Sequence, residues 1–281
     1  MRPTPGWLGA VGLAPMLLAW IAVPLHAQTA SGIIDRMLEA YEARTRDVDD
    51  YTLVQRVMGF ETVSYFEKEM VDGRPVFRLR DSAAEERDDI GEATAPGTLE
   101  EIYAIGEEFK QNAEYLGTEM MDGRPVQVLE ITNLEETRFG ESLAQDSQFR
   151  PVEGRIYLDS ETLVPRRMVF EGELRNAEGT HEVTSTMDLE DYREHRGMLL
   201  AHRTVMSVRG LGAAIDEEAR AQFRQIEEEL ENMPPDQRAM VESIMAEQLD
   251  QFRAMMEGGD EPMVVEVEVL EVWVNSGPPG A

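Results

Sequence analysis

The stretch EMVDGRPV, residues 69–76, decides the fold, because it returns almost unchanged as EMMDGRPV at residues 119–126. Each copy places an Asp-Gly pair between apolar runs. That pair favours a two-residue β-hairpin turn, in which both turn residues adopt positive φ. The proline after each turn suits the start of a strand. Two copies 50 residues apart (119 − 69) are too few for a solenoid or a propeller. The octets therefore predict two similar hairpins in one large antiparallel sheet.

Residues 1–27 have the form of a secretory signal peptide. Arg2 precedes a long uncharged, mostly apolar stretch, which ends at Ala27, a small residue at the expected cleavage position. The stretch is long enough to approach a membrane span, so an uncleaved anchor is the alternative. Pro15 and Pro24 favour cleavage. We therefore expect a soluble periplasmic protein in which residues 28–281 form a single domain.

Charge and cysteine content exclude several classes of protein. The net charge of the 281 residues is −30, and loss of Arg2 with the signal peptide makes it (26 − 1) − 56 = −31. Such a charge repels nucleic acids and anionic membrane surfaces. The chain has no cysteine, which excludes disulfides, thiolate metal sites and a lipid-bearing cysteine.

Hydrophobic periodicity assigns most of the remaining chain. Apolar residues three and four apart predict helices at residues 31–46 and 98–112. Residues 81–97 and 133–151 are acidic or poorly patterned and are expected to be loops. In the final segment alternation changes phase at Leu270, which indicates a bulge. Alternating or β-branched runs predict strands at residues 51–60, 62–71, 75–79, 115–121, 126–132, 155–159, 165–174, 182–192, 198–208 and 263–274.

Residues 213–257 read as a helical hairpin. Apolar residues recur at steps of three and four up to Met233, Pro234-Pro235 interrupts the pattern, and a second amphipathic run ends at Gly258-Gly259. A strand follows the hairpin, so it is inserted in the sheet's connectivity rather than appended to it.

These elements define an α+β fold. We expect a curved antiparallel sheet, a half-open β-barrel of about ten strands, covered by the N-terminal helix, the short central helix and the inserted hairpin. A curved sheet under amphipathic helices encloses an apolar space, which is either packed solid or holds a hydrophobic ligand.

Three short motifs resemble one family. They are YTLVQ at residues 51–55, IYLDSETLVPRR at residues 156–167, and DYR at residues 191–193 with Gly197. Together they are similar to periplasmic outer-membrane lipoprotein-sorting proteins, the LolA-like carriers. The resemblance implies a half-open barrel whose mouth is closed by helices, and acyl chains carried between them. It also implies membrane-bound donor and acceptor proteins as partners.

The leading functional hypothesis is a periplasmic carrier for lipoprotein acyl chains or another lipid, moving toward the outer membrane. The hairpin would be the lid and the concave face of the sheet the floor. The alternative is an envelope sensor or scaffold of the same fold that docks a partner protein through its hairpin. The predicted lid contacts are Phe223, Ile226, Leu230, Met240, Ile244 and Phe252, and the predicted floor contacts are Phe170 and Val205.

Enzyme chemistry finds little support. Residues 210–215 (GLGAAI) lie between a strand and a helix like a dinucleotide loop, but Ile215 replaces the last glycine and no parallel βαβ unit surrounds them. His195 and His202 flank one turn without a third metal ligand at suitable spacing. The chain has no Gly-x-Ser-x-Gly elbow and no cysteine nucleophile. We therefore expect a monomer without catalytic activity, cofactor or metal.

Overall fold

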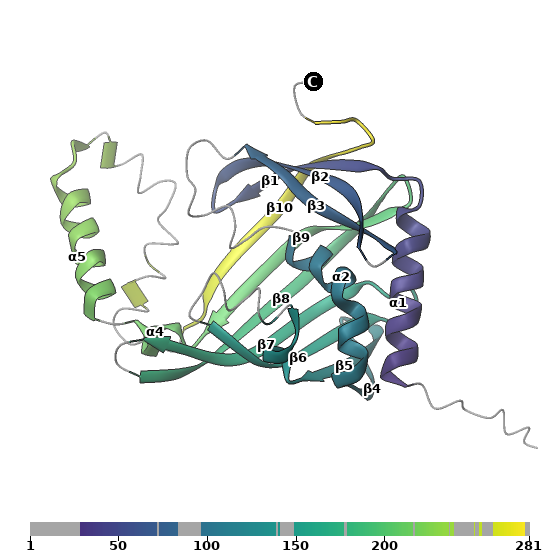
Figure 1. The fold of residues 1–281 in the computed structure, drawn as a ribbon. Coiled ribbons are helices and arrows are strands. Elements are labelled where there is room, and N and C mark those ends of the chain that lie inside the picture. Colours follow the sequence, from purple (N-terminus) through teal and green to yellow (C-terminus); the bar gives the residue numbers. More distant parts are fainter. Residues whose placement is uncertain are drawn as a thin grey trace, which may run out of the picture.

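The computed structural model shows an open antiparallel sheet with helices on one face (Figure 1). It describes residues 29–71, 73–83, 97–138, 140, 149–176, 179–215, 217–235, 237–238, 250, 253–254 and 261–278. The predicted signal peptide and most of the predicted second helix of the hairpin lie outside these residues.

The chain begins with a helix and three strands. Helix α1 (Ala30–Thr45) starts at Thr29, whose hydroxyl accepts a hydrogen bond from the Gly32 amide. Strands β1 (Asp50–Val57), β2 (Phe60–Val71) and β3 (Arg74–Ala83) follow as hairpins. The first octet forms the β2–β3 turn, as predicted.

Helix α2 (Gly97–Asn112) then leads into a second run of strands. The second octet forms the β4–β5 turn, where Asp122 and Gly123 have φ values of 49° and 76°. The strands of this run are β4 (Ala113–Met121), β5 (Arg124–Thr132), β6 (Phe149–Asp159), β7 (Pro165–Asn176), β8 (Gly179–His195) and β9 (Met198–Arg209).

The prediction of a loop at residues 133–151 is wrong at both ends. A 3-10 helix (Leu134–Glu136) buries Leu134, and β6 begins at Phe149, six residues before the expected strand. Pro151 is tolerated there because the pairing of β6 with β7 is shifted between Pro151 and Glu153. A proline at a bulge does not have to donate a ladder hydrogen bond.

The last strand of the chain lies inside the sheet and not at its edge. Helices α4 (Leu211–Ala214) and α5 (Glu217–Asn232) separate β9 from β10 (Met263–Val274). Strand β10 pairs with β1 on one side and β9 on the other, which gives the order β3-β2-β1-β10-β9-β8-β7-β6-β5-β4. The expected α+β class and the ten-stranded open sheet are confirmed. The expected bulge is confirmed too, since Val54 pairs with Glu271 and Gln55 with Val269, so that Leu270 has no partner.

Candidate functional site

A packed core fills the part of the sheet's inner face that carries α1 and α2. Ile33, Ile34 and Met37 of α1 and Ile102 and Phe109 of α2 are almost inaccessible to solvent. They contact strand residues from both ends of the sheet. The part of the inner face beneath α1 and α2 is therefore packed core.

A second apolar cluster occupies another part of the inner face. It consists of Val57, Val265 and Val267, with Met58, Met206 and Met263 packed against it and only partly buried. No helical residue of the described chain belongs to this cluster. We call it the strand cluster. Its valines are buried, and its three methionines keep some exposure.

A row of methionines connects the two clusters. Met168 pairs with Met187 and Met187 with Met206, on three neighbouring strands, and Met206 pairs with Val265. Met168 is fully buried in the core, whereas Met187 and Met206 are only partly buried. Thioether side chains are flexible and polarizable, and they adapt to apolar partners of varied shape. The row cannot be recognised in the sequence, because only the pairing of the strands brings its members together.

Two polar residues separate the clusters along the strands. On β1, Gln55 lies between Leu53 of the core and Val57 of the strand cluster. On β9, His202 lies between Leu200 and Met206. Both polar side chains are at least 95% buried. On each of these two strands, a buried polar side chain therefore lies between the packed core and the strand cluster.

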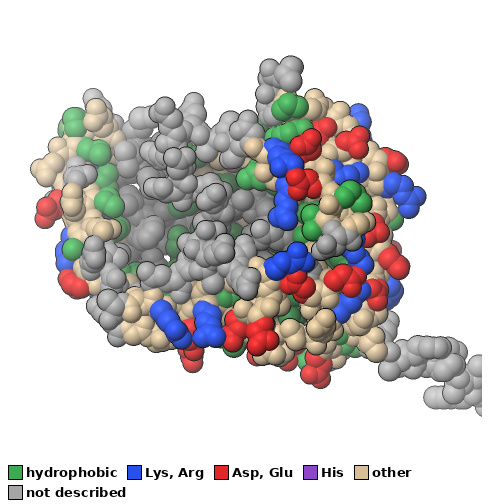
Figure 2. All heavy atoms as spheres, in the orientation of Figure 1, with side chains coloured by type: hydrophobic (Ala, Val, Ile, Leu, Met, Phe, Trp, Pro, Cys, Tyr) green, Lys and Arg blue, Asp and Glu red, His purple; other side chains and the backbone are tan. Residues whose placement is uncertain are grey.

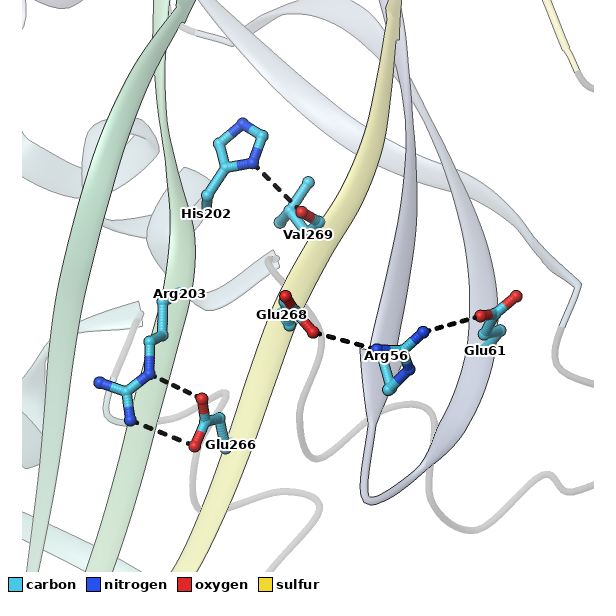
Figure 3. Close-up of polar contacts among 7 residues, drawn as sticks. All are labelled: Arg56, Glu61, His202, Arg203, Glu266, Glu268 and Val269. Atoms are coloured by element: carbon cyan, nitrogen blue, oxygen red, sulfur yellow. Dashed lines mark hydrogen bonds and ion pairs between the residues drawn. The ribbon is translucent and has the colours of Figure 1, made fainter.

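His202 is held by two polar contacts, of which Figure 3 shows the one to Val269. Its Nδ1 lies 3.1 Å from the carbonyl oxygen of Val269, and its Nε2 lies 2.8 Å from Nε2 of His195. Burial lowers the pKa of both histidines, and the nearby Arg193 guanidinium lowers it further. Among the residues that the structure describes, no group of three or more His, Asp or Glu side chains is placed to hold a metal ion.

Ion pairs cover the opposite, outer face. Arg203 contacts Glu190 and Glu266, and Arg56 contacts Glu61 and Glu268 (Figure 3). These charges are roughly half exposed, so each pair contributes little to stability. Figure 2 shows basic and acidic side chains interspersed over the part of the surface where α1 lies.

The predicted floor residues lie on different faces of the sheet. Phe170 is buried in the core on the inner face, and its ring carbon would be 3.0 Å from a Cβ added at Gly154. Val205 pairs with Glu266 and is adjacent to Arg203, on the outer face. The two residues are therefore not brought together, and Val205 does not join the strand cluster.

The described part of the predicted lid is α5. Phe223 and Leu230 are buried, whereas Ile226 is 50% exposed. Figure 2 shows hydrophobic side chains at the surface in the region of α5. Met240, Ile244 and Phe252 lie outside the described residues, so their role as lid contacts stays a prediction.

A tight turn joins the sheet to α4 and α5. Gly210 has φ of 85°, and a Cβ there would lie 2.2 Å from the Glu182 carbonyl oxygen. Glycine is therefore required for the chain to leave β9 at this point. The strands on either side are antiparallel, so the dinucleotide-binding unit that residues 210–215 loosely resemble is not formed by the described sheet.

Another buried polar group lies among the helices. Glu100 of α2 accepts hydrogen bonds from the hydroxyl groups of Tyr41 and Tyr51. Its burial raises its pKa from 4.5 to about 7.

None of the described helices has the length and apolar character needed to cross a membrane.

The comparisons concern the fold. No family model and no curated protein matches this chain. Among solved structures it is similar to a putative outer membrane lipoprotein-sorting protein domain from Vibrio parahaemolyticus, with 10% identity, 88% of this chain and 95% of that chain covered, and a TM-score of 0.40. It is similar to a DUF1329 family protein from Desulfovibrio piger, with 11% identity, 88% and 92% covered, and a TM-score of 0.42.

A third similar structure is the MucA/MucB complex of Pseudomonas aeruginosa, with 11% identity, 87% of this chain and 99% of that chain covered, and a TM-score of 0.23. At such identities the likeness is one of fold alone. The open ten-stranded antiparallel sheet is shown by the chain's own strand pairing.

Proposed function

We propose that this protein is a non-catalytic periplasmic carrier that binds acyl chains on the strand cluster and the adjoining methionine row. The observation that supports this most is the continuity of the row: Met168 is solid core, while Met187 and Met206 are partly exposed. An acyl chain lying there would contact the same kind of surface that the helices cover elsewhere. Burial of apolar chain contributes about 0.8 kcal/mol per methylene, so binding needs no charged anchor.

The helical hairpin is proposed as the lid. Phe223 and Leu230 are seven residues apart, which places them on the same side of α5, and both are buried. The predicted contacts in the second helix, Met240, Ile244 and Phe252, would complete the lid. Exchange of the acyl chain with membrane-bound donor and acceptor proteins would then require the lid to open. We leave Val205 out of the proposed site because it lies on the outer face.

Two neighbouring residues of β9 provide a matched test. Met206 lies on the inner face and Val205 on the outer face, so Met206→Gln and Val205→Gln place the same side chain on opposite sides of the sheet. The probe is a fluorescent palmitoylated peptide titrated into the protein purified from the periplasm. We expect Met206→Gln to weaken binding about tenfold, because it removes an apolar contact, and Val205→Gln to bind like the wild type. Failure of the wild type to bind, or equal losses in both variants, would overturn the proposal.

The second candidate is a scaffold that docks a partner protein through the hairpin. The exposure of Ile226, an apolar residue on the otherwise strongly charged α5, favours it. Ile226→Asp distinguishes the two functions. If the wild type binds the acyl chain and Ile226→Asp binds it with the same affinity, the protein is a carrier that uses other residues for the ligand. Two results together would favour the scaffold. The wild type would not bind the acyl probe, and one defined partner that co-purifies with the wild type would be lost from Ile226→Asp.

A further inference from the structure

The seam between β9 and β10 ends at a side-chain contact. The paired residues run from Met263 opposite Val208 to Glu268 opposite Arg203. At the next position of β10 the carbonyl oxygen of Val269 lies 3.1 Å from His202 Nδ1 (Figure 3). Beyond it, β10 shifts its register by the bulge at Leu270 and continues along β1. The imidazole therefore fastens the two strands where their backbone pairing stops.

The hydrogen-bonding pattern fixes the protons of the histidine pair. A carbonyl oxygen can only accept, so His202 Nδ1 carries a proton and, in the neutral ring, His202 Nε2 is an acceptor. His195 Nε2, 2.8 Å away, must then donate. The rings are 17° from parallel with centroids 5.1 Å apart, so the two nitrogens face each other nearly end to end. The result is a chain of donors from His195 of β8 through His202 of β9 to the Val269 carbonyl of β10.

This chain accepts one proton but not two. A first proton added to His195 Nδ1 leaves both hydrogen bonds in place. A second proton has to go to His202 Nε2, which would then point an N–H at the N–H of His195, between two cations 2.8 Å apart. The doubly protonated pair therefore cannot keep its geometry.

Other charged groups around the pair act in both directions. On β8, Arg193 lowers the pKa of both histidines, while Asp191 opposes this effect at His202. Arg203 of β9 and Glu268 of β10 are opposite each other in the strand pairing, and each forms its ion pairs on the outer face. Burial is the largest cause of the lowered pKa values. Because the folded state binds the protons less readily than the unfolded state, the stabilisation is lost as pH falls below about 6.5.

We propose that the His195–His202 pair is a proton-operated latch on the β9–β10 seam, closed while the pair holds at most one extra proton and open when both rings are charged. The latch lies between the packed core and the strand cluster. Its opening separates Val265 of β10 from Met206 of β9 and Val267 from Thr204, which are the residues opposed across the same seam. The inference rests on the strand pairing and the histidine geometry and holds whichever ligand the inner face takes.

Backbone amide hydrogen exchange tests the latch. Residues 264–268 of β10 are compared at about pH 7.5 and about pH 5, after correction for the intrinsic exchange rate at each pH. We expect their protection to fall about tenfold more in the wild type than in His195→Gln. In that variant the amide can still donate to His202, and only one imidazole remains to be charged. His181→Gln, which changes a histidine at the far end of β8, serves as the matched control and should behave like the wild type.

A second measurement keeps the test decisive if a variant folds poorly. Long-range ¹H–¹⁵N spectra of the histidine-labelled wild type report which ring nitrogen carries each proton. The latch requires a protonated Nδ1 and a bare Nε2 on His202 at about pH 7.5, and the loss of this pattern together with the amide protection on acidification. A bare Nδ1 on His202 overturns it. Equal pH responses in the wild type and His195→Gln overturn it as well.

Discussion

Glu100→Gln should abolish a pH dependence of stability that the buried carboxyl group creates. Glu100 lies in the first turn of α2 and accepts hydrogen bonds from Tyr41 of α1 and Tyr51 of β1. Burial raises its pKa from 4.5 to about 7. The folded protein therefore binds a proton more tightly than the unfolded chain, and stability rises as pH falls from about 7 to about 4.5.

The magnitude follows from the size of that difference. The gap between pKa values of 4.5 and about 7 corresponds to about 3 kcal/mol of unfolding free energy. A glutamine side chain in place of Glu100 would stay neutral at every pH and retain an acceptor oxygen. The variant should therefore be more stable than the wild type by up to about 3 kcal/mol at about pH 8, and similar to it at about pH 4.5.

Urea unfolding followed by circular dichroism measures this difference. The quantity to compare is the change in unfolding free energy between about pH 8 and about pH 5, wild type against variant. Subtraction removes the contributions of other titrating groups, including the histidine pair, which acts in the opposite direction. Glu39→Gln, at an exposed position of α1, is the control. Parallel pH profiles for the wild type and Glu100→Gln would refute the reasoning.

Three further predictions concern the sheet. Gly172→Ala should destabilise the protein more than Gly154→Ala. A Cβ at position 172 would lie 2.4 Å from the Arg150 carbonyl oxygen, whereas at Gly154 the nearest atoms belong to side chains at 2.9 and 3.0 Å. The opposite order of thermal midpoints would contradict this prediction. Arg203→Met should lower the unfolding free energy in urea by less than about 1 kcal/mol, since the arginine side chain is 42% exposed. A loss that persists unchanged at high salt would be inconsistent with a surface ion pair. Asn275→Ala should lower the unfolding free energy by about 1–2 kcal/mol, because the Asn275 side chain forms hydrogen bonds with two backbone groups of the α1–β1 connection. Asn275 has φ of 54°. Thermal unfolding unchanged from the wild type would argue against this stabilising role.

Local sequence signals determined the secondary structure and much of the topology. An Asp-Gly pair between apolar runs specifies a two-residue turn through its backbone conformation, and both copies of the octet form the predicted hairpins. Alternation with a period of two specified the strands, and the phase change at Leu270 located a bulge that the pairing of β1 with β10 confirms. These features depend on neighbouring residues, so they can be read from the chain.

The face that each strand turns inward was harder to predict. Residues 204–208 carry apolar side chains at both Val205 and Met206, so alternation alone does not choose between them. The choice is made by the neighbouring strand, which places Glu266 opposite Val205 and Val265 opposite Met206. Phe170, predicted from the sequence as a floor contact, is buried in the packed core.

The sequence by itself determined the two Asp-Gly hairpins and the acidic, cysteine-free composition of this chain. The tertiary structure alone decided that β10 returns between β1 and β9, and that Glu100 becomes a buried acid between two tyrosines. It also decided that three methionines from β7, β8 and β9 form one row. The physical reason is that turns and alternation are set by residues a few positions apart. Burial, pKa values and the composition of an inner face depend on strands that meet only after the sheet has assembled.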